Sequence, residues 1–136
     1  MKLLVEEKTA SEVIQTREKI STTADESTEW FAFDDFQKME LKVGHIKTCQ
    51  KLEKSAKLLC SEVDLGEGRL RSIVSGAAEF YTAEELTDRR VLVVANLKPI
   101  KLMGKVSEGM ILFSDDKGKL VLIEAPEHVN PGVTVR

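Results

Sequence analysis

The sequence contains few of the residues on which small disulfide-linked or aromatic-rich proteins depend. Of its 136 residues, two are cysteine, three are proline and 5% are aromatic, and the net charge is −3. Cys49 and Cys60 are too few for a disulfide framework, and a chain of this length buries enough surface to fold without one. Free cysteines are typical of a reducing compartment, so we expect a cytoplasmic protein.

Long apolar runs are also missing. No stretch of about 18 uncharged apolar residues occurs, which is the length that a membrane-spanning helix needs. The apolar start, Met1 to Val5, is followed at once by Glu6, Glu7 and Lys8, unlike the apolar core of a signal peptide. We therefore expect no membrane-spanning segment, no cleaved signal peptide and no membrane partner.

Patterns that build catalytic or metal sites are absent as well. His45, His128 and the two cysteines lack the short spacing of a zinc finger. There is no glycine-rich phosphate loop or dinucleotide-binding fingerprint, and no nucleophile stands beside an evident base and orienting group. We expect no catalytic residue, no metal ion and no cofactor, and hence a chain that is not an enzyme.

Charge is distributed unevenly along the chain. Residues 1–35 carry a balance of −5, whereas residues 36–136 carry +2. Basic residues are concentrated between Lys38 and Lys57 and again at Lys98, Lys101 and Lys105. Such clusters attract phosphates within about 8–10 Å even on a mildly acidic protein, although scattered solubilising lysines would give the same count.

The pattern predicts two regions. Thr9 to Glu12 has the spacing of a capping box and predicts a short helix, followed by a polar linker over Ser21 to Glu29. We therefore assign residues 1–29 to an N-terminal helix and polar tail and residues 30–136 to one folded domain.

The folded domain has a mainly β pattern. Short β-branched segments separated by turn signals predict strands over 41–51, 58–65, 70–75, 91–97, 110–113 and 120–123. Gly66 to Gly68 and Asp115 to Gly118 have hairpin length, and Thr82 to Leu86 has a capping box that predicts a short helix. A short helix between the third and fourth strands is typical of the five-stranded OB-fold barrel, here with a C-terminal extension.

The segment from Val94 to Leu112 carries the densest signal. Pro99 cannot donate to a strand ladder, so it predicts that pairing ends after Leu97. Gly104 and Gly109 permit tight backbone geometry. This predicts a constrained basic loop that presents three lysines to phosphate oxygens, with Ser107 as a hydroxyl donor and Met103 as an apolar surface for a base or a peptide side chain.

Four motifs in this region resemble one known family. They are Asp35 to Gly44, Lys54 to Leu58, Arg71 to Gly76, and Asn96-Leu-Lys-Pro99 continued by Lys101, Met103-Gly104 and Ser107 to Met110. Their order and content resemble the tRNA-binding domain found at the C-terminus of methionyl-tRNA synthetases and in freestanding tRNA-binding proteins. The resemblance covers about residues 33–136.

The resemblance implies an OB fold, a homodimer and noncatalytic binding of tRNA near its outer corner by shape and backbone. The scarcity of aromatic residues agrees, because binding of single strands usually relies on aromatic stacking. The expected contact residues are Lys42, Arg71, Ser75, Asn96, Lys98, Lys101, Met103, Gly104 and Ser107. For Ser75, hydrogen bonds within the barrel are the competing interpretation.

Three functions remain open. The first is a tRNA-binding domain or subunit that serves the catalytic body of methionyl-tRNA synthetase. The second is a dimeric protein similar to bacterial export chaperones, which share this fold and bind unfolded polypeptides. In the third, residues 1–29 dock on another protein and make the chain an assembly factor.

Overall fold

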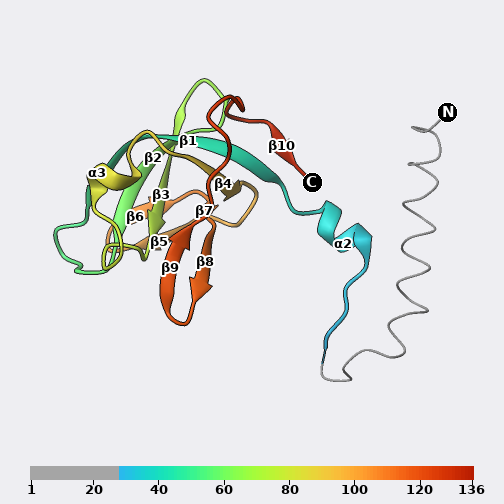
Figure 1. Ribbon diagram of the computed structural model, residues 1–136, viewed down its shortest axis with the longest axis horizontal. Coiled ribbons are helices and arrows are strands. Elements are labelled where there is room, and N and C mark those ends of the chain that lie inside the picture. Colours follow the sequence, from blue (N-terminus) through green and yellow to red (C-terminus); the bar gives the residue numbers. More distant parts are fainter. Residues whose placement is uncertain (1–27) are drawn as a thin grey trace. The chain divides into compact units, whose positions relative to one another are not determined.

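The computed structural model describes residues 28–136, and the chain divides into two units with the boundary between Lys38 and Met39. The described part of the first unit contains one short helix, α2 (Phe33–Gln37), shown in Figure 1. The rings of Phe33 and Phe36 stack with centroids 6.2 Å apart, and Lys38 pairs with Asp35 at 3.1 Å. The helix predicted near Thr9 lies outside the described residues, as does most of the predicted linker.

The second unit is mainly β, as predicted. Its elements in chain order are β1 (Leu41–Lys51), β2 (Leu59–Asp64), β3 (Leu70–Ser75), α3 (Ala83–Leu86), β4 (Arg90–Val94), β5 (Ile100–Leu102), β6 (Lys105–Ser107), β7 (Met110–Ile111), β8 (Phe113–Asp116), β9 (Lys119–Leu122) and β10 (Thr134–Val135). The main sheet has the antiparallel order β3-β2-β1-β4-β7, and β10 pairs with the first residues of β1. Within the described residues no helix is long and apolar enough to cross a membrane.

The sheet curves into a nearly closed five-stranded barrel of the OB type (Figure 1). Strand β1 is long enough to pair with β2, β4 and β10, and its register shifts between Ile46 and Thr48, which is the irregularity of a β-bulge. A bulge bends a strand and increases its twist, so one strand can serve both sides of a barrel.

The open seam of the barrel, between β3 and the segment after β6, is joined by few hydrogen bonds. The backbone N–H of Glu108 donates to the carbonyl oxygen of Ser72 at 2.8 Å. The Glu108 carboxylate in turn accepts from the Ser72 N–H at 3.1 Å, and the Ser107 hydroxyl accepts from the Val74 N–H at 3.0 Å. Side chains thus complete a closure that regular strand pairing does not supply.

The core consists of the inward-facing residues of these strands. Ile46, Val63, Ile73, Val91 and Val93 are completely buried and belong to one apolar cluster. Helix α3 caps this cluster with Leu86, also completely buried. Its predicted capping box is present: the Thr82 hydroxyl accepts from the Glu85 N–H, and the Glu85 carboxylate accepts from the Thr82 N–H.

The predicted strands at 41–51 and 70–75 are confirmed to the residue, and those at 58–65 and 120–123 agree to within one residue. The strand predicted over 91–97 is too long, because β4 ends at Val94 and the Ala95 N–H bonds the carbonyl oxygen of Glu40. The strand predicted over 110–113 is divided, since β7 ends at Ile111 and Phe113 begins the β8–β9 hairpin.

Candidate nucleic-acid interface

The segment predicted as a basic loop is largely a β-hairpin. Strands β5 and β6 pair, with Leu102 opposite Lys105. The two residues between them, Met103 and Gly104, have φ angles of 48° and 83°. Positive φ at both central residues is the geometry of the tight turns that close two-residue hairpins. The hairpin therefore holds Met103 at its tip, where 53% of the residue is exposed.

A second loop, between β1 and β2, faces this hairpin. It is closed by a hydrogen bond from the Leu52 N–H to the carbonyl oxygen of Leu58, and the Ser55 hydroxyl accepts from the Lys57 N–H. Leu52 packs with Cys60 and Val74 in a small apolar cluster that also contacts Leu102 of the hairpin. This cluster holds the loop and the hairpin beside each other.

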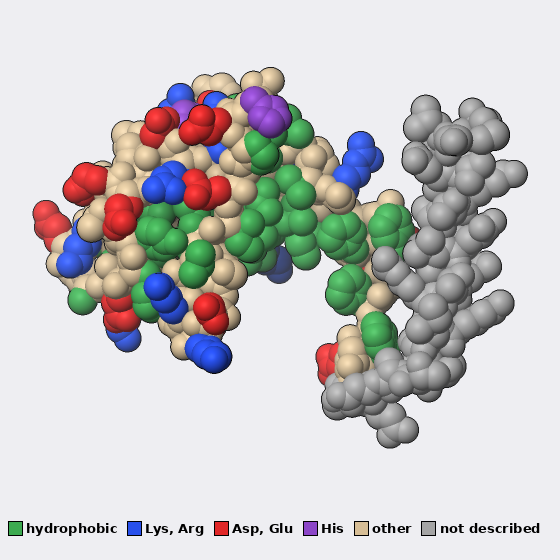
Figure 2. Space-filling view, viewed as in Figure 1, with side chains coloured by type: hydrophobic (Ala, Val, Ile, Leu, Met, Phe, Trp, Pro, Cys, Tyr) green, Lys and Arg blue, Asp and Glu red, His purple; other side chains and the backbone are tan. Residues whose placement is uncertain are grey.

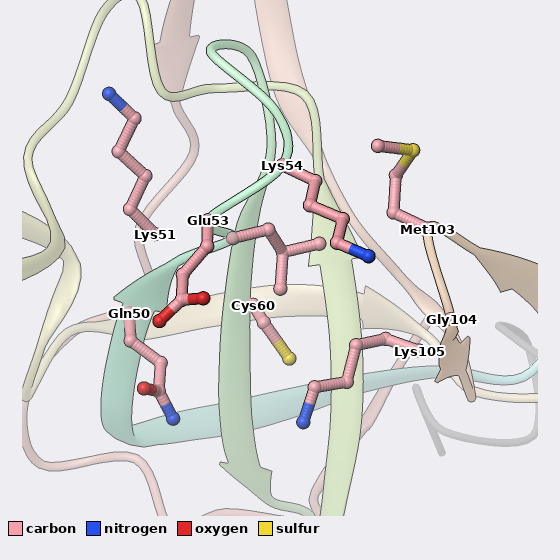
Figure 3. A pocket seen from close by; sticks show the side chains of 9 residues that line it. Gln50, Lys51, Glu53, Lys54, Cys60, Met103, Gly104 and Lys105 are labelled. Carbon is pink, nitrogen blue, oxygen red and sulfur yellow. The ribbon is translucent and has the colours of Figure 1, made fainter.

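Between the two lies a cleft of about 290 Å³ (Figure 3). It is lined by Gln50, Lys51, Leu52, Glu53, Lys54, Cys60, Met103, Gly104 and Lys105. In the OB fold the loops that follow the first and fourth strands frame the usual binding face for oligonucleotides. The cleft lies between the corresponding segments of this chain, so it is our candidate interface.

The basic residues of the domain fall into two groups. Arg69 and Arg71 are engaged within the protein: Arg71 forms a bidentate pair with Glu67 at 2.9 and 2.6 Å, and Arg69 pairs with Glu108 at 2.9 Å. The lysines of the cleft, by contrast, form no ion pair with any residue that the structure describes. Their ammonium groups remain available to an anionic partner.

Arg71 is more deeply engaged than its sequence position indicates. Its guanidinium also donates to the backbone carbonyl oxygens of Ala95 and Glu108, and its side chain is only 17% exposed. The guanidinium donates hydrogen bonds to Glu67 and lowers the pKa of that carboxyl, while Glu67 raises the pKa of Arg71. These contacts fix the β3 edge to the segments around Ala95 and Glu108, which accounts for Arg71 without a ligand.

The predicted contact residues do not form one cluster. Met103 and Gly104 line the cleft between loop and hairpin, whereas Lys98 and Asn96 line a separate depression of about 410 Å³ with Arg71. Lys101 pairs with Val106, so it projects from the opposite face of the hairpin from the Leu102–Lys105 pair. Lys42 lies on β1, near enough to Glu67 to help lower its pKa.

Two predicted contact residues lie in the interior. Ser75 is 8% exposed and Ser107 is 4% exposed. The Ser107 hydroxyl accepts from the Val74 N–H and donates to the carbonyl oxygen of Gly109 at 3.2 Å, which uses its donor. Both serines are therefore buried in the domain.

Several residues that line the cleft beside Met103 and Gly104 were not predicted from the sequence. Gln50, Lys51, Glu53 and Lys54 were not among the expected contacts, whereas Lys105 was expected to meet a phosphate oxygen as one of the three lysines of the basic loop. The sequence signal that could have pointed to them was the presence of two basic stretches, from Lys38 to Lys57 and from Lys98 to Lys105. Only the fold shows which members of these stretches meet, because Leu52 and Leu102 share an apolar cluster.

The visible face of the domain has no single sign of charge. Figure 2 shows acidic and basic side chains interspersed, with hydrophobic side chains grouped between them. The lysine-lined cleft is thus a local feature on a protein whose net charge is −3.

Among residues 28–136, no group of three or more histidine, cysteine or acidic residues is arranged to hold a metal ion. Both cysteines are free thiols. Burial raises the pKa of the Cys49 thiol, which keeps it protonated and makes it a poor nucleophile.

The sequence of this chain matches one known protein family. The family described as "Putative tRNA binding domain" matches residues 41–134. A "Methionine--tRNA ligase" of Listeria monocytogenes is 49% identical over 109 residues, which are 80% of this chain and 16% of that protein. This chain therefore spans a small part of the length of such relatives.

Solved structures agree on the fold. A methionyl-tRNA synthetase related protein from Pyrococcus horikoshii has a TM-score of 0.77 and 37% identity, over 80% of this chain and all of that chain. The chaperone CsaA from Bacillus anthracis has a TM-score of 0.71 over 79% of this chain and all of that chain, at 21% identity. The second likeness is one of fold alone.

Proposed function

The chain belongs to the tRNA-binding domain family, and we propose that it binds tRNA through the lysines that flank the cleft between the β1–β2 loop and the β5–β6 hairpin. The observation that carries this proposal is the contrast between engaged arginines and unpaired lysines. Lysines without internal partners can replace the counterions of a phosphate backbone. Phosphate contacts of this kind depend on the shape and charge of the RNA and carry no direct sequence information.

The domain itself is a noncatalytic module. We propose that it is the C-terminal domain or a subunit of methionyl-tRNA synthetase, because relatives that carry the name of that enzyme match it over 16% of their length. Its role is then to retain tRNA near a catalytic body that lies in the rest of the protein.

We further propose that the domain acts as a homodimer. An apolar groove of about 460 Å³ beside the hairpin supports self-association, and its lining includes Leu97, Ile100 and Met110, which are 47%, 54% and 43% exposed. Exposed apolar patches of this kind mark interaction surfaces. Two tRNA sites on one dimer raise the apparent affinity through effective concentration when both reach the same RNA.

The export-chaperone function has less support. An apolar groove suits an unfolded polypeptide, yet the likeness to CsaA is at 21% identity and extends to the fold alone. The family match and the unpaired lysines favour tRNA. We also propose that the protein is cytoplasmic, because its two free cysteines are typical of reducing compartments.

Fluorescence anisotropy of labelled total tRNA, titrated with the purified chain at several salt concentrations, tests the proposed function. We expect binding that weakens linearly with the logarithm of salt concentration, because each phosphate contact releases counterions. An unfolded polypeptide should not compete. Absence of tRNA binding at low salt would contradict the proposal, and binding of the polypeptide in its place would favour the chaperone function.

A further inference from the structure

The cleft between the β1–β2 loop and the β5–β6 hairpin has two chemically different sides. In Figure 3 the amide of Gln50 and the carboxylate of Glu53 lie on one side of the Cys60 sulfur, the ammonium group of Lys54 lies on the other side, and that of Lys105 lies below the sulfur. The ammonium group of Lys51 points away from the cleft in the same view. A ligand that fits both sides carries negative charge at one end and hydrogen-bond donors at the other.

The middle of the cleft is apolar. Leu52 and Cys60 are 9% and 6% exposed and form its inner surface, and Met103 lines its edge at the hairpin tip. A methionine side chain is flexible and polarisable, and it packs well against flat ring systems. The centre of the cleft therefore suits a planar group between the charged end and the hydrogen-bonding end.

A regular RNA duplex cannot supply such a group. Its bases are stacked inside the helix, and its convex backbone would touch only the lysines at the rim of a concave cleft of about 290 Å³. An unpaired nucleotide, in contrast, exposes its phosphate, its ring and the edge of its base together. Proteins that bind folded RNA read such splayed nucleotides in loops and at bulges.

The side that carries Glu53 discriminates between bases. A carboxylate only accepts hydrogen bonds, so it favours the exocyclic amino groups of cytosine, adenine and guanine. Uracil has carbonyl oxygens at the corresponding positions, and an oxygen placed against the carboxylate is repelled. The Gln50 amide can both donate and accept, so it complements any of the amino-bearing bases.

We propose that this cleft binds one unpaired nucleotide whose base carries an exocyclic amino group, with its phosphate at Lys54 and Lys105 and its amino group at Glu53. The inference rests on the proposed tRNA binding and adds a base-selective contact to it. It predicts that the domain binds short single-stranded RNA and that Glu53 sets the preference among bases.

The test uses two fluorescein-labelled RNA pentamers of equal length and charge, oligo-C and oligo-U, in fluorescence anisotropy titrations of the full chain. We expect oligo-C to bind about tenfold more tightly than oligo-U, the effect of one good base contact. Glu53→Gln should reduce this ratio to about twofold or less, whereas Glu79→Gln, which removes another exposed carboxylate that does not line the cleft, should leave it unchanged.

Lysine variants test the end of the cleft that is proposed to hold the phosphate. Lys54→Ala should weaken the binding of both pentamers by a similar factor and preserve the ratio of their affinities. Lys119→Ala, outside the cleft, should change neither affinity. Equal binding of the two pentamers, failure of both to bind, or a ratio that Glu53→Gln does not alter would each overturn the proposal. If tRNA still binds in those cases, the tRNA-binding function stands without the nucleotide site; if tRNA also fails, the proposed function fails with it.

Discussion

The hydroxyl of Ser107 accepts a hydrogen bond from the backbone N–H of Val74 at 3.0 Å, across the open seam of the barrel. Regular strand pairing does not reach this N–H, so a side chain takes the place of a strand carbonyl. A serine selected by sequence as a tRNA contact thus has a role inside the fold.

Ser107→Ala should accordingly destabilise the protein. The change leaves the Val74 N–H buried without its acceptor, which costs about 1–3 kcal/mol in the free energy of unfolding. Urea denaturation followed by circular dichroism measures this loss. Ser114→Ala, which removes an exposed hydroxyl from β8, is the matched control and should cost less. Full stability of Ser107→Ala together with weaker tRNA binding would instead make Ser107 a contact residue.

Salt dependence separates the lysines from Arg71. Lys54→Ala and Lys105→Ala should each lower the slope of log affinity against log salt by roughly 0.7–0.9, because each removes about one counterion-releasing contact. Arg71→Gln should reduce the free energy of unfolding through the loss of its contacts to Glu67, Ala95 and Glu108, while the slope stays the same. The measurements are tRNA titrations over a salt series and urea denaturation of each variant. A slope that falls with Arg71→Gln but not with the lysine variants would move the interface to the β3 edge.

Low pH should weaken the ion pairs that Arg71 forms with Glu67 and Arg69 forms with Glu108. Hydrogen bonds from Arg71 lower the pKa of Glu67 below its ordinary value of 4.5, and those from Arg69 and the Ser72 N–H do the same for Glu108. A carboxyl whose pKa is lower in the folded state contributes stability above its unfolded pKa, and this contribution is lost as the pH falls through the folded pKa. The free energy of unfolding should therefore decline as the pH falls toward and below the ordinary carboxyl value of 4.5. Glu67→Gln should flatten that decline, whereas an unchanged profile would show that the pair adds nothing to stability.

The strands were predictable where their residues repeat locally. β1 and β3 alternate or run apolar over enough residues to define them, and the capping box at Thr82 and Glu85 lies within four residues. The β5–β6 hairpin was missed because its turn places Met103, a non-glycine residue, at a φ of 48°, and neither strand exceeds three residues. Propensity gives little signal for such a turn.

The site was harder to predict than the fold because its composition depends on contacts between distant segments. Nothing local distinguishes Lys54, which lines the cleft, from Lys57, which does not. In the same way, Arg71 and Lys98 look alike as basic residues at strand ends, yet only Arg71 has Glu67 four residues away to pair with. Which charges are free is a property of the folded chain.

The C-terminal extension is joined to the barrel at Gly132, whose N–H donates to the carbonyl oxygen of Val43 at 2.7 Å. Its φ is 91°, and a Cβ at this position would lie 2.5 Å from the carbonyl oxygen of Leu65. Gly118, in the β8–β9 turn, has a similar φ of 88° but no atom within 4 Å of an added Cβ.

These two glycines allow backbone strain and steric clash to be measured separately. Gly118→Ala should cost about 1–2 kcal/mol, the penalty of a left-handed conformation for a residue with a side chain. Gly132→Ala carries the same strain and in addition forces the Leu65 backbone to move, which should add about 1–3 kcal/mol and loosen the pairing of β10 with β1. Urea denaturation of both variants gives the difference, and hydrogen exchange at the Leu41 and Val43 amides reports on the extension itself. Equal costs for the two variants would mean that the extension shifts freely and does not depend on this close approach.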